Sequence, residues 1–139
     1  MAHTLAQIGD RWTILILREL FYDASRFEQI HSVLQCPRNL LAERLERLVG
    51  DGIVSRTSYQ EPGQRSRPAY HLTDRGRDLF PILLALMHWG DHYLAADVPP
   101  VIAEHAACGG TLQTVLECDR GHSHVSVKEI DIQPGPGAL

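Results

Sequence analysis

The sequence predicts an α+β fold that is mainly α-helical and carries one small β-hairpin. Three observations lead to this prediction. Apolar residues recur at three- and four-residue steps in several stretches before residue 96, which is the period of amphipathic helices. Two short strand-like runs flank a polar loop at 61–68 that contains Gly and Pro. The length of 139 residues suits one compact domain plus a small appendage.

The first expected elements are a short helix at 4–9 and a longer helix from Arg11 to about Tyr22. Asp10 precedes the longer helix and is a good N-cap. This helix is apolar nearly all round, so it should be central in the packing. Its expected core residues are Trp12, Leu15, Ile16 and Leu20.

Two further helices, joined by a very short turn, predict a helix-turn-helix. Ser25 and Glu28 are spaced as a capping box that opens the first of them. Pro37 suits the start of the second, at 38–50, and Gly52 ends it. Two helices connected in this way form the helix-turn-helix arrangement.

The second of these helices has an apolar face and a polar face. Leu41, Leu45, Leu48 and Val49 share the face that should be buried. The outer positions are Arg38, Asn39, Leu40, Glu43, Arg44, Glu46 and Arg47, with Arg44 at the border. Arginines and a carboxamide suit contact with bases, and an outward leucine suits a thymine methyl. The alternative is an ordinary amphipathic surface helix, and the flanking elements favour the first interpretation.

A hairpin with strands at 53–59 and 69–72 follows directly, and its loop carries Gln64, Arg65 and Arg67. A hairpin with a basic tip after a helix-turn-helix predicts a winged helix. Thr73 should cap a long helix at 74–95, bent at Pro81. That helix is too apolar for the domain to cover, so a second subunit is its expected cover. Alternatively, Met87 and Trp89 line a cofactor pocket.

The distribution of charge favours nucleic acid although the net charge is −4. Residues 25–77 hold nine arginines against six acidic residues, so the acidic excess lies elsewhere. No apolar run of 18 residues spans a membrane, and the N-terminus lacks a secretory layout, so a cytoplasmic location is expected. The three cysteines do not make a disulfide framework, and Cys36 is expected to be buried in the core.

Residues 97–139 should form a separate small β-rich appendage after a domain at 1–96. Strands are expected at 111–118 and 124–132, with a turn at 119–123 and a loose tail at 134–137. Cys108, Cys118 and His122 could hold a structural zinc ion, with His124 or His105 as the fourth ligand. The ligand spacing is weak evidence, and a metal-free hairpin is the alternative. No other cofactor is expected.

Several of these runs, in order, resemble the HxlR-type winged-helix transcriptional regulators of bacteria. The resemblance rests on GDRWTILILREL, SRFEQI, residues 41–52, YHLTDRG and the pair Trp89-Gly90. It implies a dimeric DNA-binding regulator, related in fold to MarR-type proteins, with the arginine-bearing helix in the major groove and the wing on backbone or minor groove. The chain departs from the family by lacking a cysteine before the first helix. Its appendage retains only Cys108 and Cys118 of the two cysteine pairs that some relatives carry.

The expected function is therefore sequence-specific binding of double-stranded DNA by a homodimer, at an inverted-repeat operator. The alternative is a winged-helix protein-interaction module; motifs typical of enzymes are lacking, so no catalysis is expected. A small, partly aromatic effector would bind near Trp12, His88, Trp89, His92 and Tyr93. The candidate DNA-contacting residues are Ser25, Arg26, Arg38, Asn39, Leu40, Glu43, Arg44, Arg47, Gln64, Arg65 and Arg67.

Overall fold

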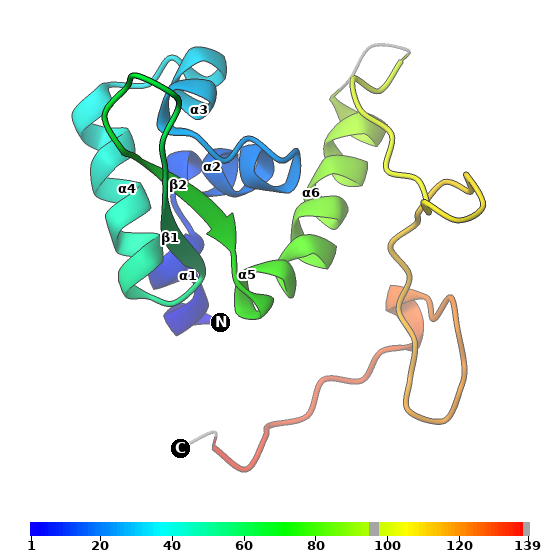
Figure 1. Ribbon diagram of the computed structural model, residues 1–139. Coiled ribbons are helices and arrows are strands. Elements are labelled where there is room, and N and C mark those ends of the chain that lie inside the picture. The colour runs from blue at the N-terminus through cyan, green and yellow to red at the C-terminus, as the bar shows by residue number, and fades with distance from the viewer. Residues whose placement is uncertain (95–97, 138–139) are drawn as a thin grey trace. The chain divides into compact units, whose positions relative to one another are not determined.

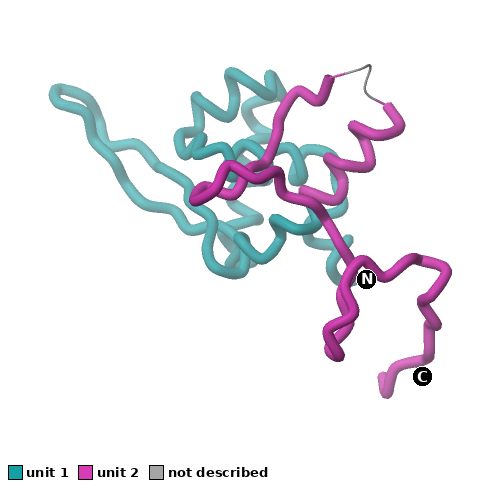
Figure 2. The backbone as a smooth tube through the Cα atoms, turned by 90° about the vertical axis from the view of Figure 1, so that its right-hand side faces the viewer, with its two compact units in different colours: residues 1–83 teal, residues 84–139 magenta. Residues whose placement is uncertain are grey.

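The structure, a computed structural model, describes residues 1–94 and 98–137 and confirms a mainly helical fold with one hairpin (Figure 1). The chain divides into two compact units, Met1–Leu83 and Leu84–Leu139 (Figure 2). The expected domain boundary at 96/97 falls at residues 95–97, outside the described residues. The elements are α1 (Ala2–Ile8), α2 (Arg11–Phe21), α3 (Phe27–Leu34), α4 (Arg38–Gly50), β1 (Val54–Tyr59), β2 (Arg67–Leu72), α5 (Asp74–Arg77), α6 (Phe80–Tyr93) and the 3-10 turn η1 (Val127–Glu129).

The core of the first unit is built around α2, as its apolar sequence predicts. Ile16 and Leu17 of α2 are fully buried, as are Ile30 of α3 and Leu41 and Leu45 of α4. Of the four expected core positions of α2, Ile16 and Leu20 are buried, whereas Trp12 and Leu15 are only half-buried. Cys36 is buried, as expected, and belongs to the same cluster. The core therefore fixes the relative positions of the helices of the helix-turn-helix.

The start of α3 differs from the prediction. Arg26, not Ser25, occupies the N-cap position, and the Arg26 backbone N–H donates to Oε1 of Gln29 at 2.9 Å. Ser25 is instead held by the hairpin, because its carbonyl oxygen accepts a hydrogen bond of 2.7 Å from the Tyr70 backbone N–H. An isolated antiparallel β-bridge between Arg26 and Ala69 extends this contact between the start of α3 and strand β2. The capping-box prediction was therefore wrong by one residue, since the sheet fixes Ser25.

The hairpin β1–β2 is the wing, residues 54–72, and its strands pair antiparallel from Val54 with Leu72 to Tyr59 with Arg67. β2 begins two residues earlier than expected and includes Pro68, which a two-stranded sheet tolerates because both strands are edges. α4 lies beside the wing (Figure 1). Pro37 is the N-cap residue of α4 rather than its first helical residue.

The expected long helix at 74–95 is two helices, α5 and α6, so that prediction was wrong in its continuity. Pro81 has no N–H to donate to the carbonyl of Arg77, and its ring crowds that carbonyl, so the helical ladder breaks between them. Thr73 caps α5 as predicted, accepting from the Gly76 N–H at 3.2 Å. A Cβ atom at Gly76 would lie 2.2 Å from the Ile53 carbonyl oxygen, so only glycine lets α5 approach the chain so closely.

The second unit lacks the strands expected at 111–118 and 124–132. In the described part of this segment, only single bridges pair Glu104 with Thr111 and Glu117 with Ser123, and η1 lies within the second expected strand. A two-stranded hairpin is marginal without an apolar face to cover. Residues such as Leu116 and Ile132 are exposed here, so no core supports longer pairing. The turn expected at 119–123 is present, closed by the second bridge.

Candidate nucleic-acid interface

Helix α4 has the two faces that its sequence predicts. Leu41, Leu45 and Leu48 are buried, whereas Asn39 and Glu43 on the opposite face are exposed. Leu40 is half-buried and therefore only partly available to a partner. The exposed face is the one that a nucleic acid could reach without disturbing the core.

The N-terminal end of α4 and the wing form one surface. An open cavity of about 400 Å³ lies between them, lined by Phe27, Glu28, Arg38, Tyr59, Arg67 and Pro68. Arg38 comes from α4 and Arg67 from β2, residues that are far apart in the sequence. The fold thus brings together an arginine of the helix and an arginine of the wing.

Arg38 is held in place but remains exposed. Its Nη1 donates to Oε2 of Glu28 at 2.9 Å, and its guanidinium lies 5.0 Å from the centre of the Phe27 ring. The hydrogen bond from Arg38 lowers the pKa of Glu28 below its usual value. More than half of each charged side chain is exposed, so solvent screens this pair. A phosphate or a guanine edge could therefore replace Glu28 as the partner of Arg38.

Arg26 and Gln64 serve the internal structure of the wing. The Arg26 guanidinium stacks 4.4 Å from the Tyr59 ring centre and pairs with Oε1 of Glu61 at 2.6 Å. Nε2 of Gln64 donates to Oε2 of Glu61 at 3.2 Å. These contacts tie the loop of the wing to the start of α3.

Beside Arg56, which pairs with Glu46 of α4, the wing exposes two further arginines, Arg65 and Arg67. Within residues 1–94 and 98–137, neither side chain makes an ion pair or a hydrogen bond. Arg67 reaches Glu28 only through longer-range electrostatic attraction. Their charge is therefore available to an anionic partner.

Arg44, Arg47 and Glu43 are engaged within the protein. Nε of Arg44 donates to Oδ1 of Asp10 at 3.2 Å, and only 19% of the Arg44 side chain is exposed. Glu43 pairs with Arg44 at 2.7 Å, and Arg47 donates to the carbonyl of Ala6. Because Asp10 also caps α2, Arg44 connects α4 to the start of the central helix.

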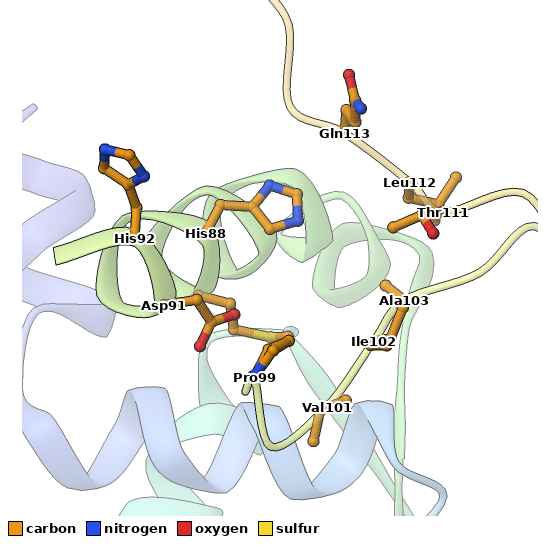
Figure 3. A pocket seen from close by; sticks show the side chains of 11 residues that line it. His88, Asp91, His92, Pro99, Val101, Ile102, Ala103, Thr111, Leu112 and Gln113 are labelled. Atoms are coloured by element: carbon orange, nitrogen blue, oxygen red, sulfur yellow. The ribbon is translucent and has the colours of Figure 1, made fainter. Parts of the chain in front are cut away.

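The residues expected near an effector do not share one cavity. His88 and His92, with Asp91, line a cavity of about 420 Å³ on α6, whose other wall is Pro99, residues 101–103 and 111–113 (Figure 3). His88 points toward residues 111–113. Trp89 and Tyr93 pack on each other at 5.4 Å and are exposed rather than lining this cavity. Trp12 belongs to the other compact unit.

Each of the two cysteines between residues 98 and 137 lies beside one histidine, which gives two separate pairs. Nδ1 of His105 lies 3.2 Å from Sγ of Cys108, and Nδ1 of His122 lies 3.2 Å from Sγ of Cys118. His124 contacts Ser123 instead, at 3.1 Å. Among the described residues, no three ligating side chains are gathered closely enough to hold a metal ion.

A family model, described as HxlR-like helix-turn-helix, matches residues 7–98. The chain belongs to this family. An uncharacterised HTH-type transcriptional regulator of Mycobacterium tuberculosis is 38% identical over 138 residues, which cover 99% of this chain and 86% of the relative. The HxlR-like chain is thus a helix-turn-helix transcriptional regulator with a winged-helix fold, as the sequence motifs predicted.

Solved structures extend the likeness of the HxlR-like chain beyond the winged helix. The crystal structure of PA1607, a candidate transcription factor, has a TM-score of 0.80 and 31% identity, and the match covers 94% of this chain and 91% of that one. The redox regulator HypR in its reduced form has a TM-score of 0.58 and 30% identity over 66% of this chain and 89% of HypR. Within the described residues, no helix is long and apolar enough to cross a bilayer.

Proposed function

We propose that this HxlR-like regulator binds an inverted-repeat operator as a homodimer in the cytoplasm, through α4 and the wing. The observation that carries the proposal is the shared cavity at which Arg38 of α4 meets Arg67 of the wing. In helix-turn-helix proteins, the N-terminal residues of the second helix contact base edges. Arg38 and Asn39 occupy these positions on α4, and both are exposed.

The polar residues of α4 and the wing have three roles in this proposal: base recognition, phosphate contact and the orientation of α4. Arg38 and Asn39 read bases, because a guanidinium matches a guanine edge and a carboxamide matches adenine. Arg65 and Arg67 hold phosphate, where charge matters more than orientation. Arg44, which the sequence alone suggested as a base reader, orients α4 through Asp10. Its Nε donates to Asp10, its Nη1 donates to Glu43, and only 19% of its side chain is exposed.

The proposed dimer contact is the apolar stripe of α6. Ile82, Leu86, Trp89 and Tyr93 are spaced by four, three and four residues, which aligns them along one side of the helix. Their exposed fractions are 45%, 50%, 57% and 65%, which is unusual for large apolar side chains spaced in this way. A second copy would cover this stripe by the two-fold packing that most homodimers use.

The dimer is tested by introducing one charge into the stripe. Trp89→Glu should give a monomer in sedimentation experiments at micromolar concentration, whereas wild type sediments as a dimer. Val33→Glu is the matched control, because Val33 is 58% exposed but lies on α3. A wild-type monomer, or a Trp89→Glu dimer, would exclude α6 as the interface.

The proposed effector is a small, partly aromatic organic molecule, bound in the cavity beside His88, Asp91 and His92. The cavity volume of about 420 Å³ is within the range of small-molecule sites, and its walls combine apolar side chains with three titratable groups. A screen of aromatic acids and amines by melting temperature tests this proposal. Binders should lose their effect in His88→Ala; a screen without a single binder would count against it.

DNA recognition is tested by selecting bound duplexes from a random pool. The selected site should be an inverted repeat whose half-site centres lie roughly 34 Å, or a multiple of this, apart. Inserting about half a helical turn of DNA between the half-sites should weaken binding far more than inserting a full turn. Only a full turn returns both half-sites to the same side of the duplex, where the two α4 helices of the dimer can reach them together. If the pool yields no enriched duplex, the alternative of a protein-interaction module replaces DNA recognition.

A further inference from the structure

The segment from 98 to 137 has ordered turns but little hydrophobic support. In the part of the chain that the structure describes, every buried apolar residue lies at or before Leu84. Val98, Val127 and Ile132 are each at least three-quarters exposed. Small segments that cannot bury a core usually depend on a disulfide or a metal ion. A cross-link within this segment would supply that missing support.

Two tight turns in this segment each present one histidine and one cysteine. In the first turn, the backbone N–H groups of Cys108 and Gly109 donate to the His105 carbonyl, and the His105 N–H donates to Gly110. In the second turn, Cys118 N–H donates to the His122 carbonyl at 3.0 Å. An isolated β-bridge closes each turn: Glu104 pairs with Thr111 around the first turn, and Glu117 pairs with Ser123 around the second. The turns therefore hold each pair in a fixed geometry.

The distances within the pairs suit two neighbouring ligands of one ion. With Zn–S of about 2.3 Å and Zn–N of about 2.0–2.1 Å, the S···N edge of a tetrahedron is roughly 3.5 Å. The Sγ···Nδ1 distance is 3.2 Å in both pairs, which is only a few tenths of an ångström shorter than the edge expected around a bound zinc ion.

We propose that His105, Cys108, Cys118 and His122 together bind one zinc ion. Two thiolates and two imidazoles in a tetrahedron form a common structural zinc site. Binding requires the two turns, which lie apart along the chain in Figure 1, to close on each other through the connecting residues 109–117. Each thiol loses its proton when its sulfur becomes a ligand, so binding releases two protons per ion.

His105 rather than His124 is the fourth ligand. The sequence admits either histidine, but His105 shares a turn with Cys108, whereas His124 has a positive φ of 60° and contacts Ser123. The proposal concerns the second unit and does not depend on DNA binding by the first.

Metal content of the untagged full-length protein tests the site. Protein purified under reducing conditions without chelator should retain one zinc ion per chain, and exchange with Co²⁺ should give the intense visible absorption of a tetrahedral thiolate site. Zinc should also slow proteolysis within 98–137 after the apo-protein is prepared with a chelator. A chain without stoichiometric zinc and without cobalt absorption would overturn the proposal, as would one ion per two chains.

Matched variants test the ligand set. His105→Ala and Cys118→Ala should each weaken Co²⁺ binding by roughly 100-fold or more, since even changes behind a ligand cost 10- to 100-fold. His124→Ala and Cys36→Ala should bind as wild type does, because neither side chain belongs to the two pairs. Equal losses in His105→Ala and His124→Ala would contradict the assignment, and so would a Cys108–Cys118 disulfide in the freshly purified protein.

Discussion

Asp10 connects the central helix to the proposed recognition helix, and its removal should affect both. Its Oδ1 accepts from the backbone N–H groups of Trp12 and Thr13, each at 3.1 Å, and its Oδ2 accepts from the Thr13 hydroxyl at 2.5 Å. The same carboxylate pairs with Arg44 at 3.2 Å. Asp10→Ala therefore removes a helix cap, a partner of a buried hydroxyl and an ion pair in one substitution.

The expected loss of stability is the sum of these contributions. Loss of an N-cap costs about 1 kcal/mol. Thr13 is only 1% exposed, so its unpaired hydroxyl adds about 1–2 kcal/mol. The Arg44 pair is partly exposed and adds about 0.5 kcal/mol after screening. Asp10→Ala should thus lower the free energy of unfolding by about 2–4 kcal/mol, whereas Asp10→Asn keeps an oxygen acceptor and should lose less.

Urea unfolding, followed by circular dichroism, measures this loss. A double-mutant cycle with Arg44→Met isolates the contact between α2 and α4, because the two substitutions should be less than additive. If Asp10→Ala unfolds within about 0.5 kcal/mol of wild type, the cap and the contact are not formed. Strict additivity with Arg44→Met would refute the role of Arg44 in orienting α4.

The pH dependence of stability gives an independent check on Asp10. Burial alone would raise the pKa of Asp10, but the hydrogen bonds from Thr13 and Arg44 outweigh burial and lower the pKa below its ordinary value of 3.8. Since the pKa is lower in the folded state, ionised Asp10 stabilises the fold above the ordinary pKa, and this contribution is lost as pH falls through the folded pKa. Asp10→Asn should therefore lose less stability than wild type on acidification below about pH 4.

Two further predictions concern glycine packing and the charge of the interface. Gly76→Ala should destabilise the protein by about 2 kcal/mol or more in urea unfolding, because its Cβ would overlap the Ile53 carbonyl. Gly50→Ala, at the end of α4, is the control: outside its own helix backbone no atom lies within 4 Å of the Cβ position, so the substitution should be neutral or stabilising, and equal losses would refute the packing argument. Glu28→Gln should tighten DNA binding in a fluorescence titration, because it frees Arg38 and removes a negative charge; unchanged or weaker binding would contradict the proposed exchange of partners.

The helical periodicity, the cap at Asp10 and the order of elements made most of the first unit predictable from sequence. Local patterns carry this information, because an apolar stripe and a capping residue lie within a few positions of each other. Pro81 marked the place where the helix expected at 74–95 fails, but the same local signal fits a bend or a full break. The close approach of α5 to Ile53 at Gly76, by contrast, depends on contacts distant in sequence.

The candidate site was predictable in composition but not in the roles of its residues. The exposure of Arg38 and Asn39 could be predicted, because the apolar periodicity of α4 places both residues on its outer face. Arg44 has the same residue type and a neighbouring position, yet it pairs with Asp10 across 34 residues of sequence. Periodicity cannot distinguish a base reader from an internal partner, because that difference lies in which distant carboxylate the fold brings near.

The salt dependence of DNA affinity is the most direct test of the central proposal. Wild type, Arg38→Ala and Arg65→Ala would be titrated on the selected duplex and on random duplexes from low to high salt. Arg65→Ala should weaken binding to both and reduce the salt slope by about one unit, whereas Arg38→Ala should lose roughly 10- to 100-fold on the selected site and much less on random DNA. If wild type shows no preference between duplexes, or if both variants bind as wild type does, α4 and the wing do not recognise DNA in the proposed way.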